Sequence, residues 1–378
     1  MDISTLCIHG SDDSSHSTGS VTVPIYQTAT FVHPAVGEST GYDYSRLQNP
    51  TREQLENIVA KLEDGVDALA FSTGMAAIAT MIELFKVGDH IIASDDLYGG
   101  SHRLFNQLSM KNGINFNFVN TSDISEVTKH IKQETKAIFI ETPTNPMMKV
   151  TDIAAVSAIA KEHNILLIVD NTFLTPYFQN PIALGADIVV HSGTKYLSGH
   201  NDTLAGFLVV GTWKLSEKLR FIYKTTGACL APFDSWLVIR GIKTLAVRME
   251  KQQENAKIIA KWLCAQPKIK SVYYTGLPTN PGYELTRKQA RGFGAMISFK
   301  VDNEKTATQL LERVELILYA ESLGGVETLI TYPMLQTHAD IPKEEREANG
   351  IDEKLLRLSV GLENVEDILS DLKQALGD

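Results

Sequence analysis

Short apolar runs alternate with stretches of helical periodicity along the middle of the chain. These runs are rich in Ala, Ile, Leu, Val and Phe, and they cover residues 68–71, 90–93, 116–119, 137–141, 166–170, 187–191 and 206–210. Several are continuously apolar, which is typical of strands that are covered on both faces. The pattern predicts an α/β unit with a mostly parallel sheet, in which ligands bind beyond the carboxyl ends of the strands.

The two ends of the chain follow different patterns. The Ser, Thr, Gly and Pro content of the first fifty residues favours an extended arm. Thr51 and Gln54 form a capping box, which predicts that a helix begins there. Beyond residue 232 a long helical stretch begins near Asp234, and further predicted strands and helices lie at 295–301, 303–314, 355–360 and 364–376. We expect an arm (1–50), a large domain (51–232) and a smaller α+β C-terminal domain (233–378).

Composition narrows the class of protein. The 378 residues include 43% hydrophobic and 21% charged residues, enough for two domains with a large core. A net charge of −10 argues against nucleic acid or an anionic membrane surface as the main partner, and apolar runs are too short to cross a membrane. Three dispersed cysteines suggest neither a disulfide framework nor a zinc site, and no signal peptide is visible. We expect a cytoplasmic protein that binds a small molecule and contains no metal.

Two polar residues follow buried strands and suggest chemistry at one crevice. Asp170 closes the run 166–170, and Lys195 follows the run 187–191. Burial lowers the pKa of a lysine, which suits an amine that forms an imine with an aldehyde, and a nearby carboxylate can keep a ring nitrogen protonated. Pyridoxal phosphate requires this combination. The alternative is a surface lysine and an Asp that caps a loop.

A phosphate site would complete this interpretation. Ser72-Thr-Gly-Met75 follows a predicted strand and opens an apolar helix over 75–85, so backbone N–H groups and the positive end of the helix would face the crevice. The alternative is a simple N-cap on a buried helix. The sequence contains neither a Gly-x-Gly-x-x-Gly motif after a strand nor a P-loop, which disfavours dinucleotides and Walker-type nucleotides.

Short blocks of polar and glycine-rich sequence occur in order along nearly the whole chain. They are Tyr44-Ser-Arg46, Asn49-Pro-Thr-Arg, Ser72-Thr-Gly-Met75, Asp95-Asp-Leu-Tyr98-Gly-Gly, Glu141-Thr-Pro-Thr-Asn145-Pro, Val169-Asp170-Asn-Thr-Phe, His191-Ser192-Gly-Thr194-Lys195-Tyr, Glu321-Ser322-Leu-Gly-Gly and Leu356-Arg357-Leu-Ser-Val-Gly. Together they resemble the Cys/Met-metabolism family of pyridoxal-phosphate enzymes, which includes cystathionine γ-synthase, O-acylhomoserine thiolyase, the cystathionine lyases and methionine γ-lyase. The resemblance implies fold type I and pyridoxal 5'-phosphate as cofactor.

The same resemblance implies residues that act on the cofactor. Lys195 would bind it covalently and carry protons, Asp170 would pair with the pyridinium nitrogen, and Tyr98 would stack on the ring. These three are the expected catalytic residues. The resemblance also implies contacts with the phosphate and with the phenolic oxygen of the ring. The phosphate would be bound by Gly74, Met75, Ser192 and Thr194, and the phenolic oxygen by Asn145.

Tyr44 and Arg46 resemble an arm that enters the active site of a neighbouring subunit. A guanidinium offers a planar fork to a phosphate, although Arg46 is alternatively a solvated charge beside the turn at Asn49 and Pro50. The resemblance therefore implies a homodimer with shared active sites, arranged as a dimer of dimers. We expect a homotetramer.

Four further residues would bind an amino-acid substrate by this resemblance. Arg357 would hold the α-carboxylate, with Ser322 helping to orient it, while Arg103 and Glu321 would bind a distal carboxylate and a distal ammonium. Either of the last two is alternatively a solvated surface charge. Together they suit cystathionine.

Local differences from the family members favour one reaction. Methionine γ-lyases usually carry Cys at the position of Gly100, whereas several blocks resemble the synthase and thiolyase branch. We therefore expect a transferase of methionine and cysteine metabolism that performs γ-replacement on an O-acylhomoserine, with cysteine giving cystathionine or sulfide giving homocysteine. Thr225 and Thr226 depart from the synthase pattern and leave that loop's distal contacts open. One alternative is a cystathionine γ-lyase or β-lyase of transsulfuration. Another is a catalytically silent binding or regulatory protein, which would be expected to lack Lys195, Asp170 or Arg357, and all three are present.

Overall fold

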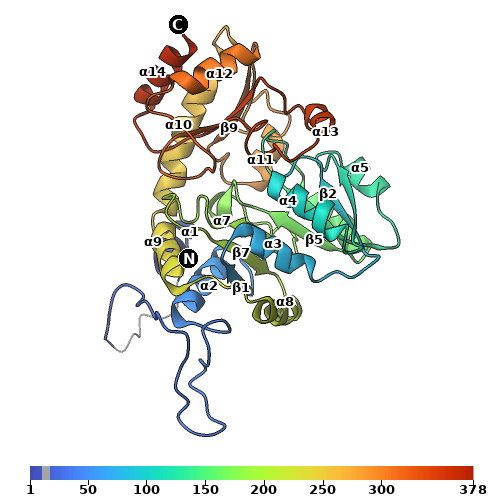
Figure 1. Ribbon diagram of the computed structural model, residues 1–378, viewed down its shortest axis with the longest axis vertical. Helices are drawn as coiled ribbons and strands as arrows, with labels where there is room; N and C mark the ends of the chain where they lie inside the picture. The colour runs from blue at the N-terminus through green and yellow to red at the C-terminus, as the bar shows by residue number, and fades with distance from the viewer. Residues whose placement is uncertain (11–17, 378) are drawn as a thin grey trace.

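A seven-stranded, mostly parallel sheet forms the centre of the computed structural model, which describes residues 1–10 and 18–377 (Figure 1). Its strands are β1 (Asp67–Phe71), β2 (His90–Ser94), β3 (Asn115–Val119), β4 (Thr135–Glu141), β5 (Leu166–Asp170), β6 (Ile188–Ser192) and β7 (Gly206–Val210). Their order is β1-β7-β6-β5-β4-β2-β3, and only β7 pairs antiparallel with its neighbours. The predicted strands are present with ends shifted by at most two residues, so the predicted α/β fold is confirmed.

Helices cover both faces of this sheet. They are α2 (Pro50–Leu62), α3 (Gly74–Ile82), α4 (Gly99–Arg103), the π-helix η1 (Leu104–Ser109), α5 (Ile124–Lys129), α6 (Ile153–Glu162), α7 (Thr175–Phe178) and α8 (Trp213–Thr226). Along β5, Leu167 and Val169 belong to one apolar core and Ile168 to the other. Two-sided burial therefore explains why the strands are continuously apolar.

A five-stranded sheet follows in the second half of the chain. Its strands are β8 (Ile269–Tyr273), β9 (Met296–Val301), β10 (Leu318–Tyr319), β11 (Leu329–Thr331) and β12 (Leu355–Ser359), in the order β10-β11-β12-β9-β8. In the described part of this half, α9 (Pro232–Ile242) packs against α2, and the helices that follow are α10 (Leu245–Cys264), α11 (Tyr283–Gln289), α12 (Glu304–Arg313), α13 (Lys343–Ala348) and α14 (Val365–Leu376). Helix α10 runs from beside α9 to the level of α12 and α14, and so connects the two halves of the molecule (Figure 1).

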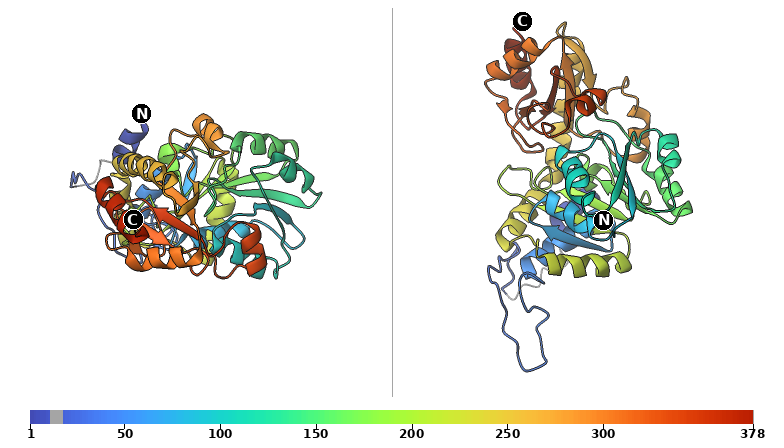
Figure 2. Two further views of the ribbon diagram at one scale, coloured as in Figure 1. Left: turned by 90° about the horizontal axis from the view of Figure 1, so that it is seen from above. Right: turned by 45° about the vertical axis from the view of Figure 1, so that its right-hand side comes forward.

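The amino-terminal segment differs from the expected arm in two respects. Residues Ile3–His9 form helix α1, which packs against α2 and α10 and buries Cys7. Helix α2 is capped by Asn49 instead of Thr51, with Pro50 as its first residue, because the Thr51 hydroxyl donates a hydrogen bond to the Pro24 carbonyl. Much of the remaining segment up to α2 projects from the body (Figures 1 and 2), and residues 11–17 of the predicted arm lie outside the described residues.

The helices and strands that were predicted for the second half of the chain have mixed outcomes. The long helical stretch near Asp234 consists of α9 and α10, which are separate helices, and the short strands β8, β10 and β11 were not predicted. The predicted helices at 303–314 and 364–376 correspond to α12 and α14. Within residues 1–10 and 18–377, no helix is long and apolar enough to cross a membrane, and no cluster of His, Cys, Asp or Glu could hold a metal.

Candidate active site

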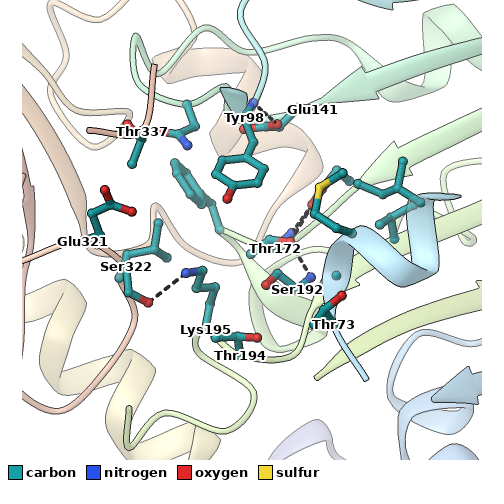
Figure 3. A pocket seen from close by; sticks show the side chains of 18 of the residues that line it. Thr73, Tyr98, Glu141, Thr172, Ser192, Thr194, Lys195, Glu321, Ser322 and Thr337 are labelled. Atoms are coloured by element: carbon teal, nitrogen blue, oxygen red, sulfur yellow. Dashed lines mark hydrogen bonds between the residues drawn. The ribbon is translucent and has the colours of Figure 1, made fainter. Parts of the chain in front are cut away.

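A cavity of about 300 Å³ lies at the carboxyl ends of β4, β5 and β6 (Figure 3). The large sheet and the helix after β1 provide most of its walls, and residues 321–323, Thr337 and Arg357 close it from the second half of the chain. Its lining residues include Thr73, Gly74, Met75, Tyr98, Glu141, Asn145, Asp170, Thr172, Ser192, Thr194, Lys195, Glu321, Ser322, Thr337 and Arg357. The cavity thus combines both halves of the molecule, as expected for ligand binding at the end of a parallel sheet.

The amino end of helix α3 forms one wall. The Thr73 side chain caps the helix by accepting a hydrogen bond from the Ala76 amide at 2.9 Å. The amides of Gly74 and Met75 lie in the first turn, where backbone N–H groups have no acceptor within the helix. A Cβ on Gly74 would lie 3.1 Å from the Cβ of Ser192, so the absence of a side chain allows the helix to approach β6 closely. The wall therefore presents N–H donors suited to an anion.

Lys195 projects into the cavity opposite this wall. Its Nζ donates a hydrogen bond of 2.7 Å to the Ser322 hydroxyl, and Figure 3 shows the two side chains meeting. Burial, together with the nearby positive charge of Arg357, lowers the pKa of Lys195 to about 8, although Glu321 opposes this shift. At neutral pH the neutral, nucleophilic form of this amine is therefore a minor fraction, but a much larger one than in an exposed lysine.

Two carboxyl groups from adjacent strands face the cavity. Asp170 on β5 and Glu141 on β4 are partners in strand register and are both buried. Asp170 accepts hydrogen bonds from the amide and hydroxyl of Thr172, and Glu141 accepts one from the Tyr98 amide at 3.1 Å. Burial raises the pKa of both groups, and the charge of Asp170 raises the pKa of Glu141 further. The pair therefore favours a single negative charge.

Arg357 is held by a set of oxygen acceptors beside Lys195. It donates hydrogen bonds of 2.9 Å to the Asn145 side-chain oxygen and to the Ser322 carbonyl, and one of 3.2 Å to the Thr331 hydroxyl. Its Nε is buried and has no hydrogen-bond partner among the described residues. Burial lowers the pKa of Arg357 to about 10, so the group remains a cation at neutral pH with one free donor.

Tyr98 lies over the same space from the loop that enters α4. A Cβ on Gly100 would come within 2.5 Å of the Tyr98 ring, so glycine at this position leaves room for the ring. Figure 3 shows the ring between the Lys195 side and the Glu141 side of the cavity. A flat aromatic face, a low-pKa amine, buried carboxyls and a glycine-lined anion site are groups that suit pyridoxal phosphate.

Three of the predicted site residues do not line the cavity. Arg103 forms an ion pair with Asp340 and is half exposed. Arg46 donates a hydrogen bond to the Lys224 carbonyl at the end of α8, and its guanidinium lies 5.5 Å from the Tyr44 ring. Within one chain, Tyr44 and Arg46 are therefore outside the site.

The cavity also contains residues that were not predicted to belong to the site. Glu141 ends a strand next to Asp170, and this strand-end position is a signal that could have identified it. Thr172 lies two residues after Asp170 and carries the same signal. Thr337 lies in a loop after β11, where the sequence pattern offers no such indication.

Comparison with known proteins agrees with this geometry. A family model described as "Cys/Met metabolism PLP-dependent enzyme" matches residues 4–377. The chain is 50% identical to cystathionine beta-lyase of Lactococcus lactis (99% of this chain, 98% of the relative), and 49% identical to cystathionine gamma-synthase/O-acetylhomoserine (thiol)-lyase of Bacillus subtilis (96% and 93%). The crystal structure of cystathionine gamma-lyase from Lactobacillus plantarum complexed with L-serine matches with a TM-score of 0.97 at 44% identity, covering 100% of this chain and 99% of that one.

The fold and the site therefore define a pyridoxal-phosphate-dependent enzyme of fold type I. The chain belongs to the Cys/Met metabolism PLP-dependent enzymes, and pyridoxal phosphate is its cofactor. Its relatives are named for synthase and for lyase reactions, so their names do not select one reaction for this chain.

Proposed function

We propose that this protein catalyses γ-replacement on an O-acylhomoserine, with cysteine giving cystathionine or sulfide giving homocysteine. The placement of Lys195, Arg357 and Glu321 around a single cavity supports chemistry on such an amino acid, and the observation that favours replacement is a second cavity that adjoins the first. A substrate held in the first cavity by its α-carboxylate has an amine beside its reacting carbons and a carboxylate available to a second ammonium group. Cystathionine carries such a distal ammonium.

The residues that would hold the cofactor follow from the cavity walls. The amides of Gly74 and Met75 and the hydroxyls of Ser192 and Thr194 would bind the phosphate, Asn145 the phenolic oxygen, and Asp170 the pyridinium nitrogen. Tyr98 would lie against the ring and Lys195 would be its covalent attachment point. When bound, the cofactor supplies an electron sink that stabilises negative charge on the carbon next to the substrate amine.

Arg357 would bind the α-carboxylate of the substrate. Its Nη groups already bind Asn145, Ser322 and Thr331, which fixes the plane of the guanidinium. The buried Nε is free to donate to a carboxylate oxygen, which would satisfy a donor that is otherwise costly to bury. A fixed carboxylate orients the Cα–H bond, and orientation decides which bond of the substrate is broken.

Lys195 would then move protons along the substrate. A pKa of about 8 allows the amine to accept the Cα proton and to return a proton nearby at similar pH, which is the requirement for a single group that acts as base and acid. The Ser322 hydroxyl, 2.7 Å from Nζ, would hold the amine in position between these transfers. Cleavage of the Cγ–O bond would release the acyloxy group as a carboxylate. Cγ would then be open to the sulfur of the second substrate, whose thiol loses its proton as the C–S bond forms.

A larger neighbouring cavity supports replacement over simple cleavage. It has a volume of about 900 Å³ and shares Thr194, Leu204, Glu321 and Ser322 with the cofactor cavity. It therefore offers space for a second substrate next to the reacting carbon. Its other lining residues include Asp202, Asp234 and Glu327, which suit the ammonium group of an incoming amino acid such as cysteine.

Cleavage of cystathionine by γ- or β-elimination is the second candidate. It is supported by relatives that carry lyase names at up to 50% identity over nearly the whole chain. The residues proposed to act in replacement would serve elimination equally, because both reactions begin with removal of the Cα proton.

A substrate panel analysed by mass spectrometry tests the proposal. The purified holoenzyme is incubated with O-acetyl- or O-succinylhomoserine plus cysteine or sulfide, and separately with cystathionine. We expect cystathionine or homocysteine to form from an acylated homoserine with a higher kcat/KM than that of cystathionine cleavage. Efficient cleavage of cystathionine with negligible turnover of both esters would establish the lyase and reject γ-replacement.

A further inference from the structure

His338 is a buried histidine next to the candidate active site that has no role in the proposed mechanism. It lies in the loop between β11 and α13 and is 1% exposed. Its Nε2 lies 3.1 Å from the Asn145 carbonyl oxygen and 3.2 Å from the Leu97 carbonyl oxygen, and its Nδ1 lies 2.8 Å from the Thr337 hydroxyl. All ring nitrogens are thus engaged with neighbours close to the cavity.

These contacts fix the form of the imidazole ring. Because Nε2 faces two carbonyl oxygens, which only accept hydrogen bonds, Nε2 carries the hydrogen and Nδ1 accepts from the Thr337 hydroxyl. Burial and the charge of Arg357 lower the pKa of His338 to about 4, so the ring is neutral at neutral pH. Because the ring stays neutral and keeps one tautomer at neutral pH, it can hold the two carbonyl groups in fixed positions.

The two carbonyl groups belong to loops that position different site residues. Leu97 immediately precedes Tyr98, and the side chain of Asn145 accepts the hydrogen bond from Arg357. The loop of His338 also packs closely against the start of α4, because a Cβ on Gly99 would lie 2.1 Å from the Thr337 carbonyl oxygen. One N–H group therefore ties together the loop before Tyr98 and the loop that orients Arg357.

We propose that His338 is a positioning residue that acts through Asn145 to direct the Arg357 guanidinium at the α-carboxylate of the substrate. This inference rests on the proposed role of Arg357 as the carboxylate-binding residue. It assigns to His338 a contribution to the recognition of one substrate group, in addition to any contribution to packing.

A purely structural role would consist of fastening residues 333–349 to the large sheet unit. Other residues provide that attachment independently. Nε2 of His102 in α4 lies 2.7 Å from a carboxylate oxygen of Glu345 in α13. Among the described residues, His102 forms no hydrogen bond with Asn145 or Leu97. His102 is therefore a matched control, since it joins the same two segments without reaching Arg357.

Binding of two small ligands to the holoenzyme separates these roles. L-Serine carries an α-carboxylate, and 2-aminoethanol is the same molecule without it. Replacing His338 by Leu removes the donor and fills its space with an apolar side chain. Replacing it by Gln retains an N–H donor near the position of Nε2. We expect His338→Leu to weaken L-serine binding about tenfold, because two buried carbonyl groups lose their donor and Asn145 can shift.

The remaining variants complete the test. Binding of 2-aminoethanol to His338→Leu is expected to change by less than about twofold, His338→Gln to bind L-serine within about threefold of the parent enzyme, and His102→Ala to bind both ligands normally. In an Arg357→Lys background, His338→Leu should add little further loss, since the two residues act in sequence. Equal weakening of both ligands, a full additional loss in that background, or unchanged L-serine binding would overturn the proposal.

Folding failure and failure of the carboxylate assignment give distinct results. If His338→Leu yields no folded holoenzyme, His338→Asn is used, since its amide ends one bond short of Nε2 and should show the same selective loss of L-serine binding; binding at the parent level would overturn the inference. If Arg357→Lys itself leaves L-serine binding unchanged, the proposed role of Arg357 is wrong, and the inference about His338 is rejected with it.

Discussion

Lys195 lowers the stability of the cofactor-free protein and at the same time provides the reactive amine of the candidate active site. The amine is buried beside the cation Arg357, and the hydrogen bond to Ser322 is to a neutral group. Burial and the positive charge of Arg357 disfavour its charged form, and Glu321 opposes this effect only in part. The residue therefore destabilises the cofactor-free fold in return for an amine that is reactive near neutral pH.

This conflict predicts a pH-dependent gain in stability for Lys195→Met. The pKa is about 8 in the folded chain and 10.5 for an ordinary lysine, so between these values the unfolded chain binds more protons and stability rises with pH. Below pH 8 the full cost is present, and the variant should stabilise the cofactor-free protein by up to about 3 kcal/mol at pH 7. Urea unfolding at pH 7 and above pH 10 measures the difference, which should nearly vanish at the higher pH.

The control for this measurement is an exposed lysine. The side chain of Lys129 is 69% exposed and pairs with Glu126 on the surface, so Lys129→Met should change stability by less than about 0.5 kcal/mol at either pH. A gain for Lys195→Met that is absent at pH 7, or equal at both pH values, would contradict the assigned burial of the charge.

The paired carboxyls predict unequal responses to amide substitution. Because the pKa of Glu141 is raised by burial and by Asp170, its neutral form persists to higher pH, and Gln should replace it with a loss of less than about fivefold in kcat/KM at pH 6–7. Asp170→Asn should lose at least about a hundredfold, since an amide cannot stabilise the ring proton. Steady-state kinetics of both variants decides; a larger loss for Glu141→Gln than for Asp170→Asn would reverse the two roles.

At the scale of elements, the amino end of α3 depends on close contact with β6. Gly74→Ala would place a Cβ 3.1 Å from the Cβ of Ser192, so the helix end and the strand end must separate slightly. We expect the dissociation constant for pyridoxal phosphate to rise about tenfold, because the donors on both elements move apart. Titration of the cofactor-free protein measures this. Gly211→Ala is the control, since its nearest neighbour would be 3.7 Å away, and an equal effect there would exclude the proposed cause.

The predictability of each element follows from the range of the interactions that define it. The strands of the large sheet were predictable because burial on both faces leaves a continuous apolar run, as in β5. The start of α2 was wrongly predicted at Thr51 because the hydroxyl of that residue binds Pro24, a contact that local spacing does not reveal. Strands β10 and β11, with two and three residues, are too short to produce a pattern.

The candidate site divides in the same way. Residues at strand ends, such as Asp170 and Lys195, could be proposed from position alone, whereas Ser322 and Arg357 were proposed only through family resemblance. His338 was not found because its partner Leu97 lies 241 residues away in sequence. Only the packing of the second half of the chain on the first brings such residues together.

At the scale of the whole molecule, the position of Arg46 outside its own site predicts complementation between subunits. If Arg46 binds the phosphate of a neighbour, as the family resemblance implies, Arg46→Ala should weaken cofactor retention. Mixing it with Lys195→Ala should restore up to about a quarter of the parent activity, because a mixed dimer contains one undamaged site. Activity is measured after joint refolding, with each variant alone as control; mixed dimers without activity would exclude a shared site.

The ion pair between Arg103 and Asp340 has a bearing on how the enzyme would choose among substrates. The chain itself already supplies a carboxylate to this half-exposed guanidinium. A substrate whose far end reaches Arg103 would exchange one anion for another, with little net change in free energy. Arg103 would then favour ligands of the correct length that carry a distal carboxylate, without making them bind tightly. A product with such a carboxylate could therefore dissociate readily.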